Sequence, residues 1–291
     1  MLSFLIELRV PIVNGLLLGG LYGIIGIGMS MIFGIVRLVN LAHGDLIILA
    51  SYLSLVTMTL FPVSPFLTLI IVIPAMCIIG FVVQYYLLNQ VLGKGMNPPL
   101  LVAFGLSIIV QNILLLIFTP DARTLLTSIS VKTIPIGSFL NIPVVYLMDF
   151  IFSLITIALL SRFFNRTYMG KAIRAASDDE GAAQLMGINT KTIYAFAMGI
   201  ATGTAAIAGV LVGMTFTFYP HTGPEYLIIA FGVVIIGGLG SMLGTFLGGL
   251  ILGLAQILGA HFLGPGFQLL SGYLILLIVL TFKPTGLFAK G

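Results

Sequence analysis

The chain has 291 residues, of which 59% are hydrophobic and 7% charged, and its formal net charge is +4. A soluble protein of this length needs more polar surface than these residues supply, so the composition excludes a soluble globular fold and predicts a multi-pass membrane protein. The net charge is too small, and too confined to the ends of apolar runs, to indicate a partner such as nucleic acid.

Apolar runs separated by proline, glycine and charge predict an all-α polytopic bundle of about eight or nine transmembrane helices, each needing roughly 20 apolar residues. In chain order the expected spans are 11–33, 46–60, 66–88, 99–118, 143–161, 192–214, 227–243, 244–263 and 268–282. The stretch 227–263 fits equally well one span plus a re-entrant segment. We expect residues 1–291 to form a single transmembrane domain.

Small residues recur at intervals of four in several spans. In lipid, helices associate through close backbone contact, which small residues at i and i+4 permit. The pattern therefore predicts packing faces, and a seam that slides during transport fits it as well. The predicted packing glycines are Gly15, Gly19, Gly23, Gly209, Gly213, Gly240, Gly244 and Gly248.

Polar residues interrupt the apolar sequence at two places that could line a translocation path. Asn40, His43 and Asp45 lie between the first two spans, either in a cytoplasmic turn or in a broken helix at membrane depth. At that depth they are costly unless they are paired or line a polar path, and a purely structural role for His43 is equally compatible. Gln111 and Asn112 in the fourth span favour hydrogen bonds between helices.

A single carboxylate, Asp149, lies near one end of the fifth span. From there its side chain can reach the membrane interface.

The longest polar segment is 162–191, which holds five of the twelve basic and three of the eight acidic residues. Ser177 and Glu180 match a capping box, which predicts a short helix from about 178 to Met186 with Gly187 just after it. Its face would present Ala182, Leu185 and Met186. The segment is either such a helix, available to a partner, or a solvated connection.

Nine alternating spans place 34–45, 89–98, 162–191 and the tail after Phe282 on one side of the membrane. These segments carry nine of the twelve Lys and Arg residues, namely Arg37, Lys94, Arg162, Arg166, Lys171, Arg174, Lys191, Lys283 and Lys290. Because basic residues stay in the cytoplasm, the large loop and the C-terminus are expected to be cytoplasmic.

The sequence contains no GxxxxGK[ST] loop, no HExxH, no GxSxG and no cysteine pair. It therefore predicts no catalytic residues, no metal site and no cofactor, and His221 and His261 lie far from His43. A carrier coupled to ions would be expected to bury carboxylates within its spans, whereas Asp149 lies only near the end of one. Ion coupling is therefore not indicated, and solute movement is either passive or driven by a partner.

Four segments carry a family resemblance: Asn14–Tyr52, Met169–Asn189, AFGVVIIGGLGSMLGTFLGG from Ala230 to Gly249, and KPTGLF from Lys283 to Phe288. In this order they resemble the LivH-type permeases of branched-chain amino-acid ABC importers. The resemblance implies a type II-like permease fold in the bacterial inner membrane and import of branched-chain or other hydrophobic amino acids. Related permeases move urea, short amides or other amino acids, and a stand-alone channel is the competing class.

The resemblance also implies partners and site residues. The partners are a second, LivM-like permease, two cytoplasmic ATP-binding subunits, and a periplasmic or lipid-anchored solute-binding protein. The stretch Asn40–Asp45 matches a family motif with Leu41 in place of phenylalanine. The ATPase-docking residues implied by the resemblance are Ala175, Ala176, Asp179, Ala182, Gly187 and Ile188, and the predicted helix face adds Leu185 and Met186.

Overall fold

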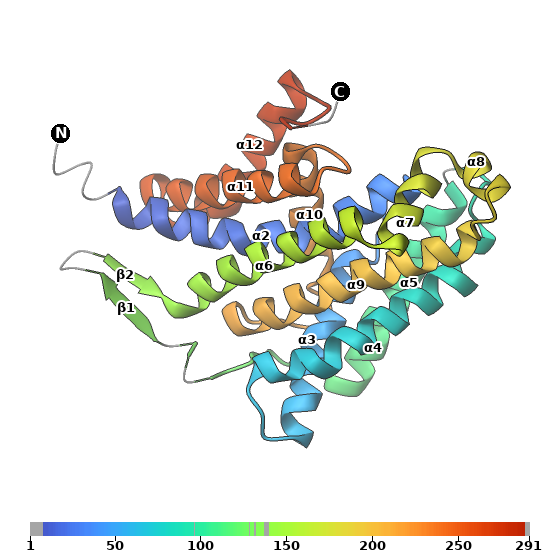
Figure 1. Ribbon diagram of the computed structural model, residues 1–291. Coiled ribbons are helices and arrows are strands. Elements are labelled where there is room, and N and C mark those ends of the chain that lie inside the picture. Colours follow the sequence, from blue (N-terminus) through green and yellow to red (C-terminus); the bar gives the residue numbers. More distant parts are fainter. Residues whose placement is uncertain (1–7, 96, 128, 131, 137–139, 289–291) are drawn as a thin grey trace.

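The computed structural model describes residues 8–288 except 96, 128, 131 and 137–139, so Lys290 of the predicted basic tail lies outside it (Figure 1). The elements, in chain order, are α2 (Arg9–Val36), α3 (His43–Leu60), α4 (Pro65–Tyr86), η1 (Leu88–Gln90), α5 (Asn97–Phe118), β1 (Thr133–Ile136), β2 (Leu140–Pro143), α6 (Val144–Arg166), α7 (Tyr168–Asp178), α8 (Glu180–Leu185), α9 (Thr190–Thr215), α10 (Gly223–Gly237), α11 (Met242–Leu263), η2 (Pro265–Phe267) and α12 (Gln268–Phe282).

In the described part of the chain, eight helices are long and apolar enough to cross a membrane, which confirms the predicted all-α polytopic bundle. Of the two alternatives for 227–263, two full spans is wrong, because α10 has 15 residues and ends at Gly237, whereas α11 is long enough to span. Gly238 (φ 97°) and Gly240 (φ 79°) then turn the chain into α11. These left-handed backbone angles are ones that glycine adopts without steric cost, so the turn falls where the glycines lie.

The centre of the bundle is α2, which runs antiparallel to α11 with the two backbones in contact. Gly15, Gly19 and Gly23 lie opposite Leu254, Leu250 and Phe246, respectively. Glycine occurs on both sides of the seam: a Cβ added to Gly253 would lie 2.5 Å from the carbonyl oxygen of Gly15, and one added to Gly249 would lie 2.5 Å from the Gly23 nitrogen. The sequence pattern had not singled out Gly249 and Gly253.

The remaining predicted packing glycines contact other elements. Gly244 and Gly248 face Gly237 of α10, and Gly209 lies against Ile47 and Ser51 of α3. Ser51 donates a hydrogen bond of 2.7 Å to the Gly209 carbonyl.

Two positions of the predicted helix faces are corrected by the structure. Gly240 belongs to the turn before α11, where it touches Gly34. Gly213 faces Leu125 and Phe218, which belong to connecting segments and not to a helix. The interval of four residues was present at both positions, but the neighbouring element was not a helix.

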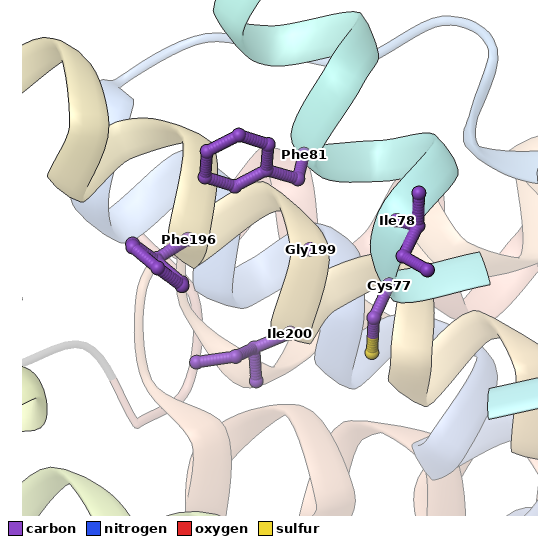
Figure 2. Close-up of a pocket in the computed structure, with 6 residues that line it drawn as sticks. All are labelled: Cys77, Ile78, Phe81, Phe196, Gly199 and Ile200. Atoms are coloured by element: carbon purple, nitrogen blue, oxygen red, sulfur yellow. The ribbon is translucent and has the colours of Figure 1, made fainter. Parts of the chain in front are cut away.

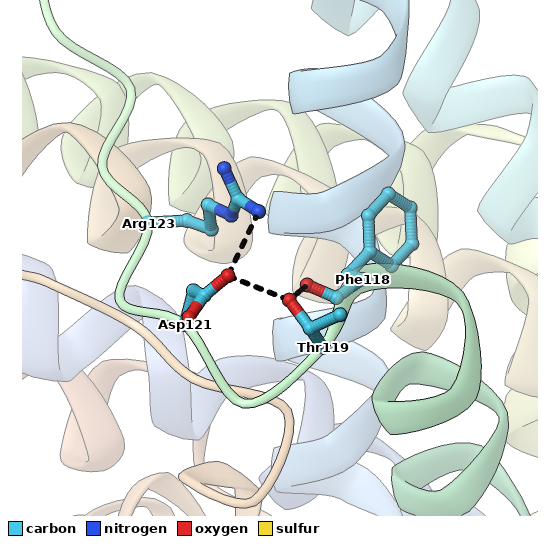
Figure 3. Close-up of polar contacts among 4 residues, drawn as sticks. All are labelled: Phe118, Thr119, Asp121 and Arg123. Atoms are coloured by element: carbon cyan, nitrogen blue, oxygen red, sulfur yellow. Dashed lines mark hydrogen bonds and ion pairs between the residues drawn. The ribbon is translucent and has the colours of Figure 1, made fainter.

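The two ends of the bundle differ in structure. The antiparallel hairpin β1–β2 and the start of α2 lie at one end, called here the hairpin end, whereas α7 and α8 lie at the other, called the α8 end (Figure 1). At the hairpin end, Arg123 and Phe218 pair through their backbones, and Leu125 donates to the Gly213 carbonyl at 2.7 Å. Figure 3 shows the Asp121 carboxylate between Arg123, at 3.5 Å, and the Thr119 hydroxyl, at 2.7 Å.

We expect Gly19→Ala to weaken the bundle, because its Cβ would lie 2.6 Å from Leu250 Cα and would separate α2 from α11. The expected loss is about 1–3 kcal/mol of unfolding free energy, as for other overpacked contacts, measured by denaturation in mixed detergent. Gly105→Ala in α5 is the matched control, since nothing lies within 4 Å of its added Cβ. Equal stability of the two variants would contradict the backbone contact.

Candidate functional site

After α2 the chain turns back into the bundle. Arg37 (φ 58°) ends the helix, and six residues later His43 Nε2 donates to the Ile25 carbonyl at 3.0 Å. Ile25 lies eleven residues before the last residue of α2, which corresponds to about 16 Å along the helix axis. The chain therefore re-enters the bundle beside the middle of α2, which agrees with the broken-helix alternative for 34–45 and not with an exposed turn.

Asn40 shapes this break. Its Oδ1 accepts a hydrogen bond from the Ala42 nitrogen at 3.1 Å, which is the local turn that asparagine favours. The Asn40 carbonyl accepts from the His43 nitrogen at 3.1 Å, and Asn40 Nδ2 lies 3.9 Å from the Met198 sulfur of α9. Asn40 is buried and holds the start of α3 against α9.

The second broken element, α10, begins against the start of α3. A Cβ added to Gly44 would lie 1.9 Å from the Gly223 carbonyl oxygen, and one added to Gly223 would lie 1.9 Å from Asp45 Oδ1. Only glycine fits at either position. The N-termini of α3 and α10 thus meet inside the protein, the arrangement that transporters use to place partial positive charge within a membrane.

Asp45 lies at this junction with 1% of its surface exposed, and its Oδ1 has no hydrogen-bond partner in the described structure. Its carboxylate faces Ser107 and Gln111 of α5, and Gln111 Nε2 donates to Ser107 Oγ at 3.1 Å. Because Asp45 sits in the first turn of α3 and beside the first turn of α10, both helix dipoles stabilise a negative charge there.

Of the candidate path residues, Asn40, His43, Asp45 and Gln111 therefore lie around one junction. Asn112 does not: it is exposed, and its Nδ2 donates to the Ile108 carbonyl of its own helix at 2.8 Å, so its place in the path stays a prediction. Adjacent residues of a helix point about 100° apart, so Gln111 and Asn112 cannot share one face.

Two buried polar pairs were not anticipated. Asp149 is fully buried and accepts a 3.0 Å hydrogen bond from Thr215 at the end of α9, so the expectation that it reaches the interface is wrong. Tyr22 donates a 2.6 Å hydrogen bond to Gln256 across the α2–α11 seam. In each case the sequence signal was a lone polar residue in an apolar run.

A cavity of about 350 Å³ lies between α4 and α9, lined by Cys77, Ile78, Phe81, Phe196, Gly199 and Ile200 (Figure 2). The Phe81 and Phe196 rings meet edge to face with centroids 5.1 Å apart. The lining is almost wholly apolar, and Ile78 is largely exposed on the side of the bundle. The groove therefore has the chemistry of a hydrocarbon-facing surface and not of a polar solute path.

At the α8 end, the cap of α8 is Asp179 and not Ser177 as predicted. Asp179 Oδ1 accepts from the Ala182 nitrogen at 2.9 Å, while α7 continues through Ser177 to Asp178. Ser177 Oγ instead donates to the Gly34 carbonyl at 2.7 Å. The local capping-box pattern does not predict this bond, because the partner of the Ser177 hydroxyl, Gly34, is distant in sequence.

Glu180 serves α8 differently from the capping-box role expected of it. Its carboxylate accepts from Gln184 at 3.2 Å and from Thr190 at 3.1 Å, which ties α8 to the start of α9. Gly187 (φ 82°) follows α8 in the left-handed conformation predicted for it.

The exposed surface of this end is apolar at its tip. Leu185 is 90% exposed and Met186 is 83% exposed, and Ala175, Asp179, Ala182 and Gly187 are exposed around them. Ile188 is half-buried. Ala176 is only 2% exposed, which corrects its place among the surface residues: α7 packs this side chain inward, and Tyr194 donates to its carbonyl at 3.3 Å.

Comparisons with known proteins agree with this architecture. Residues 11–280 match the family described as "Branched-chain amino acid transport system / permease component". The chain belongs to this family. It is a multi-pass transport permease and not an enzyme.

Relatives match along almost the whole length. The high-affinity branched-chain amino acid transport system permease protein BraD of Pseudomonas aeruginosa is 31% identical over 96% of this chain and 95% of its own. The corresponding LivH of Salmonella typhimurium is 31% identical over 95% of this chain and 94% of its own. PsaBC from Streptococcus pneumoniae, solved in complex with Fab, is similar with a TM-score of 0.50 at 14% identity, covering 94% of this chain and 91% of that chain, which shows a shared fold alone.

We expect Asp179→Ala to loosen α8, because removing an N-cap costs about 0.5–2 kcal/mol of helix stability. The backbone amides of 180–186 should then exchange hydrogen faster, measured by mass spectrometry in detergent. Asp178→Ala is the matched control, since Asp178 ends α7 and makes no cap to α8. Faster exchange in the Asp178 variant than in the Asp179 variant would contradict the cap assignment.

Proposed function

We propose that this chain is the permease subunit of an ATP-binding-cassette importer that carries branched-chain or other hydrophobic amino acids across the bacterial inner membrane. Its membership of the permease family supports the transport role. The printed names of BraD and LivH, matched over nearly all of their length, support the substrate class.

The observation that supports transport driven by a partner protein is the exposed apolar tip of α8, formed by Leu185 and Met186 outside the spans. Exposed apolar groups at the surface of a water-facing loop favour a protein partner that covers them. The sequence has no phosphate-binding loop of its own. Energy would therefore enter through partner ATPases that dock on α8 and bind the two conformations of the permease with different affinities.

The proposed assembly contains a second, LivM-like permease, two ATP-binding subunits and a solute-binding protein. The excess of basic residues on the segments of the α8 end favours a cytoplasmic position for that end and for the C-terminus. The hairpin end would then face the solute-binding protein outside. Solute selection would lie largely in that protein, which keeps urea, short amides or another amino acid as alternative cargo.

We expect Leu185→Asp and Met186→Asp each to release the ATPase subunits, because each places a charge where an apolar contact is proposed. Co-purification of the ATPases with the tagged permease measures docking, and ATP-dependent amino-acid uptake in proteoliposomes measures transport. Leu126→Asp is the matched control, since it is 71% exposed at the hairpin end and should leave co-purification intact.

Retained co-purification and uptake in both α8 variants would contradict the docking assignment. Full-speed uptake by liposomes containing this chain alone, without ATP, would instead show a stand-alone channel. The two measurements therefore separate an error in the docking site from an error in the transport class.

A further inference from the structure

Gly34, near the end of α2, touches two elements that are far from it in sequence. On one side its carbonyl accepts the 2.7 Å hydrogen bond from Ser177 in the last turn of α7. On the other side it meets the turn between α10 and α11: a Cβ added to Gly34 would lie 3.0 Å from Gly240 Cα, and one added to Gly240 would lie 3.1 Å from Gly34 Cα. Gly34 therefore lies between the last turn of α7, which leads into α8, and the turn that follows α10.

The docking side of this contact is held together as a unit. Glu180 of α8 is hydrogen-bonded to Thr190 at the start of α9, and Tyr194 of α9 to the Ala176 carbonyl of α7. A displacement of α8 therefore carries the last turn of α7, and Ser177 with it.

The other side is equally continuous. Gly238, after the last residue of α10, donates to the Val234 carbonyl at 2.8 Å, and Ser241 donates to the Gly238 carbonyl at 3.2 Å. The turn therefore moves with α10, whose first residue, Gly223, abuts Gly44 at the junction inside the bundle.

We propose that Gly34 is a positioning residue that transmits movement of the docking helix α8 to α10, and so to the junction of Gly44 with Gly223. This inference rests on the proposed function, because it assumes that ATPases push on α8. Backbone meets backbone at Gly34 and Gly240, so no flexible side chain absorbs the displacement, and close-packed contacts transmit it.

The test is the amount of solute taken up per ATP hydrolysed by the reconstituted full transporter. Gly34→Ala and Gly34→Val insert one and then three carbon atoms between α2 and the turn. Both should lower this ratio, the valine variant more than the alanine variant, within the range of about 2- to 30-fold that variants along a coupling path show. ATP hydrolysis itself should continue. Gly105→Ala, with open space around its added Cβ, should leave the ratio unchanged.

A second variant tests the other side of Gly34 without adding volume. Ser177→Ala removes the hydrogen bond to Gly34 and should also lower the ratio, whereas Ser177→Thr, which keeps the hydroxyl, should restore it in part. Ser271→Ala is the matched control, because its hydroxyl bonds the Phe267 carbonyl within its own segment of the chain.

An assembled Gly34→Val transporter with the wild-type ratio would overturn the inference and leave the proposed function standing. If that variant does not assemble, Ser177→Ala decides: a normal ratio overturns the inference and a lowered one supports it. Failure of the wild-type chain to retain ATPase subunits is a separate result, and it would overturn the proposed function as well.

Discussion

The structure depends on one constraint: a helix can be broken inside a membrane only where surrounding protein satisfies or covers its backbone ends. In this chain α3 begins inside the bundle after the break at residues 37–42, α10 has only 15 residues, and the first turns of the two helices lie against each other at Gly44 and Gly223. The remaining elements enclose that junction. His43 is held by the Ile25 carbonyl of α2, Asn40 lies against α9, and α5 brings Ser107 and Gln111 towards Asp45.

The enclosure requires close helix packing, and in lipid the hydrophobic effect contributes little free energy to helix association. The chain obtains close packing by removing side chains from the contacts, most clearly along the α2–α11 seam, where glycines face backbone on both helices. Hydrogen bonds between α2 and α11 and between α9 and α6 then fix the orientation, through Tyr22 with Gln256 and Thr215 with Asp149. These polar residues of the spans therefore have a structural role, which is to hold one helix against the next.

The sequence was sufficient for the features that depend on local composition. Apolar runs located the spans, and Gly187 marked the left-handed residue that follows the end of α8. It was insufficient where a distant partner decides the outcome. Ser177 matched a local cap but bonds Gly34, 143 positions away in the chain, so Asp179 takes the cap. For the apolar run 227–263 the sequence left two alternatives open, two spans or one span plus a re-entrant segment, because glycines and not polar residues end the 15-residue α10.

The same reasoning explains why the glycines spaced by four predicted packing faces but not the elements that pack against them. Helix α11 carries two of them, Gly244 with Gly248 towards α10, and Gly249 with Gly253 towards α2. Spacing identifies a face but not its neighbour, so only the fold shows that α11 packs backbone against backbone on two sides. As a consequence α10, which starts at Gly223 and ends at Gly237, has glycine contacts at both ends. Movement of such a helix needs no repacking of large side chains at its ends, which suits the movement proposed for α10 inside an otherwise close-packed bundle.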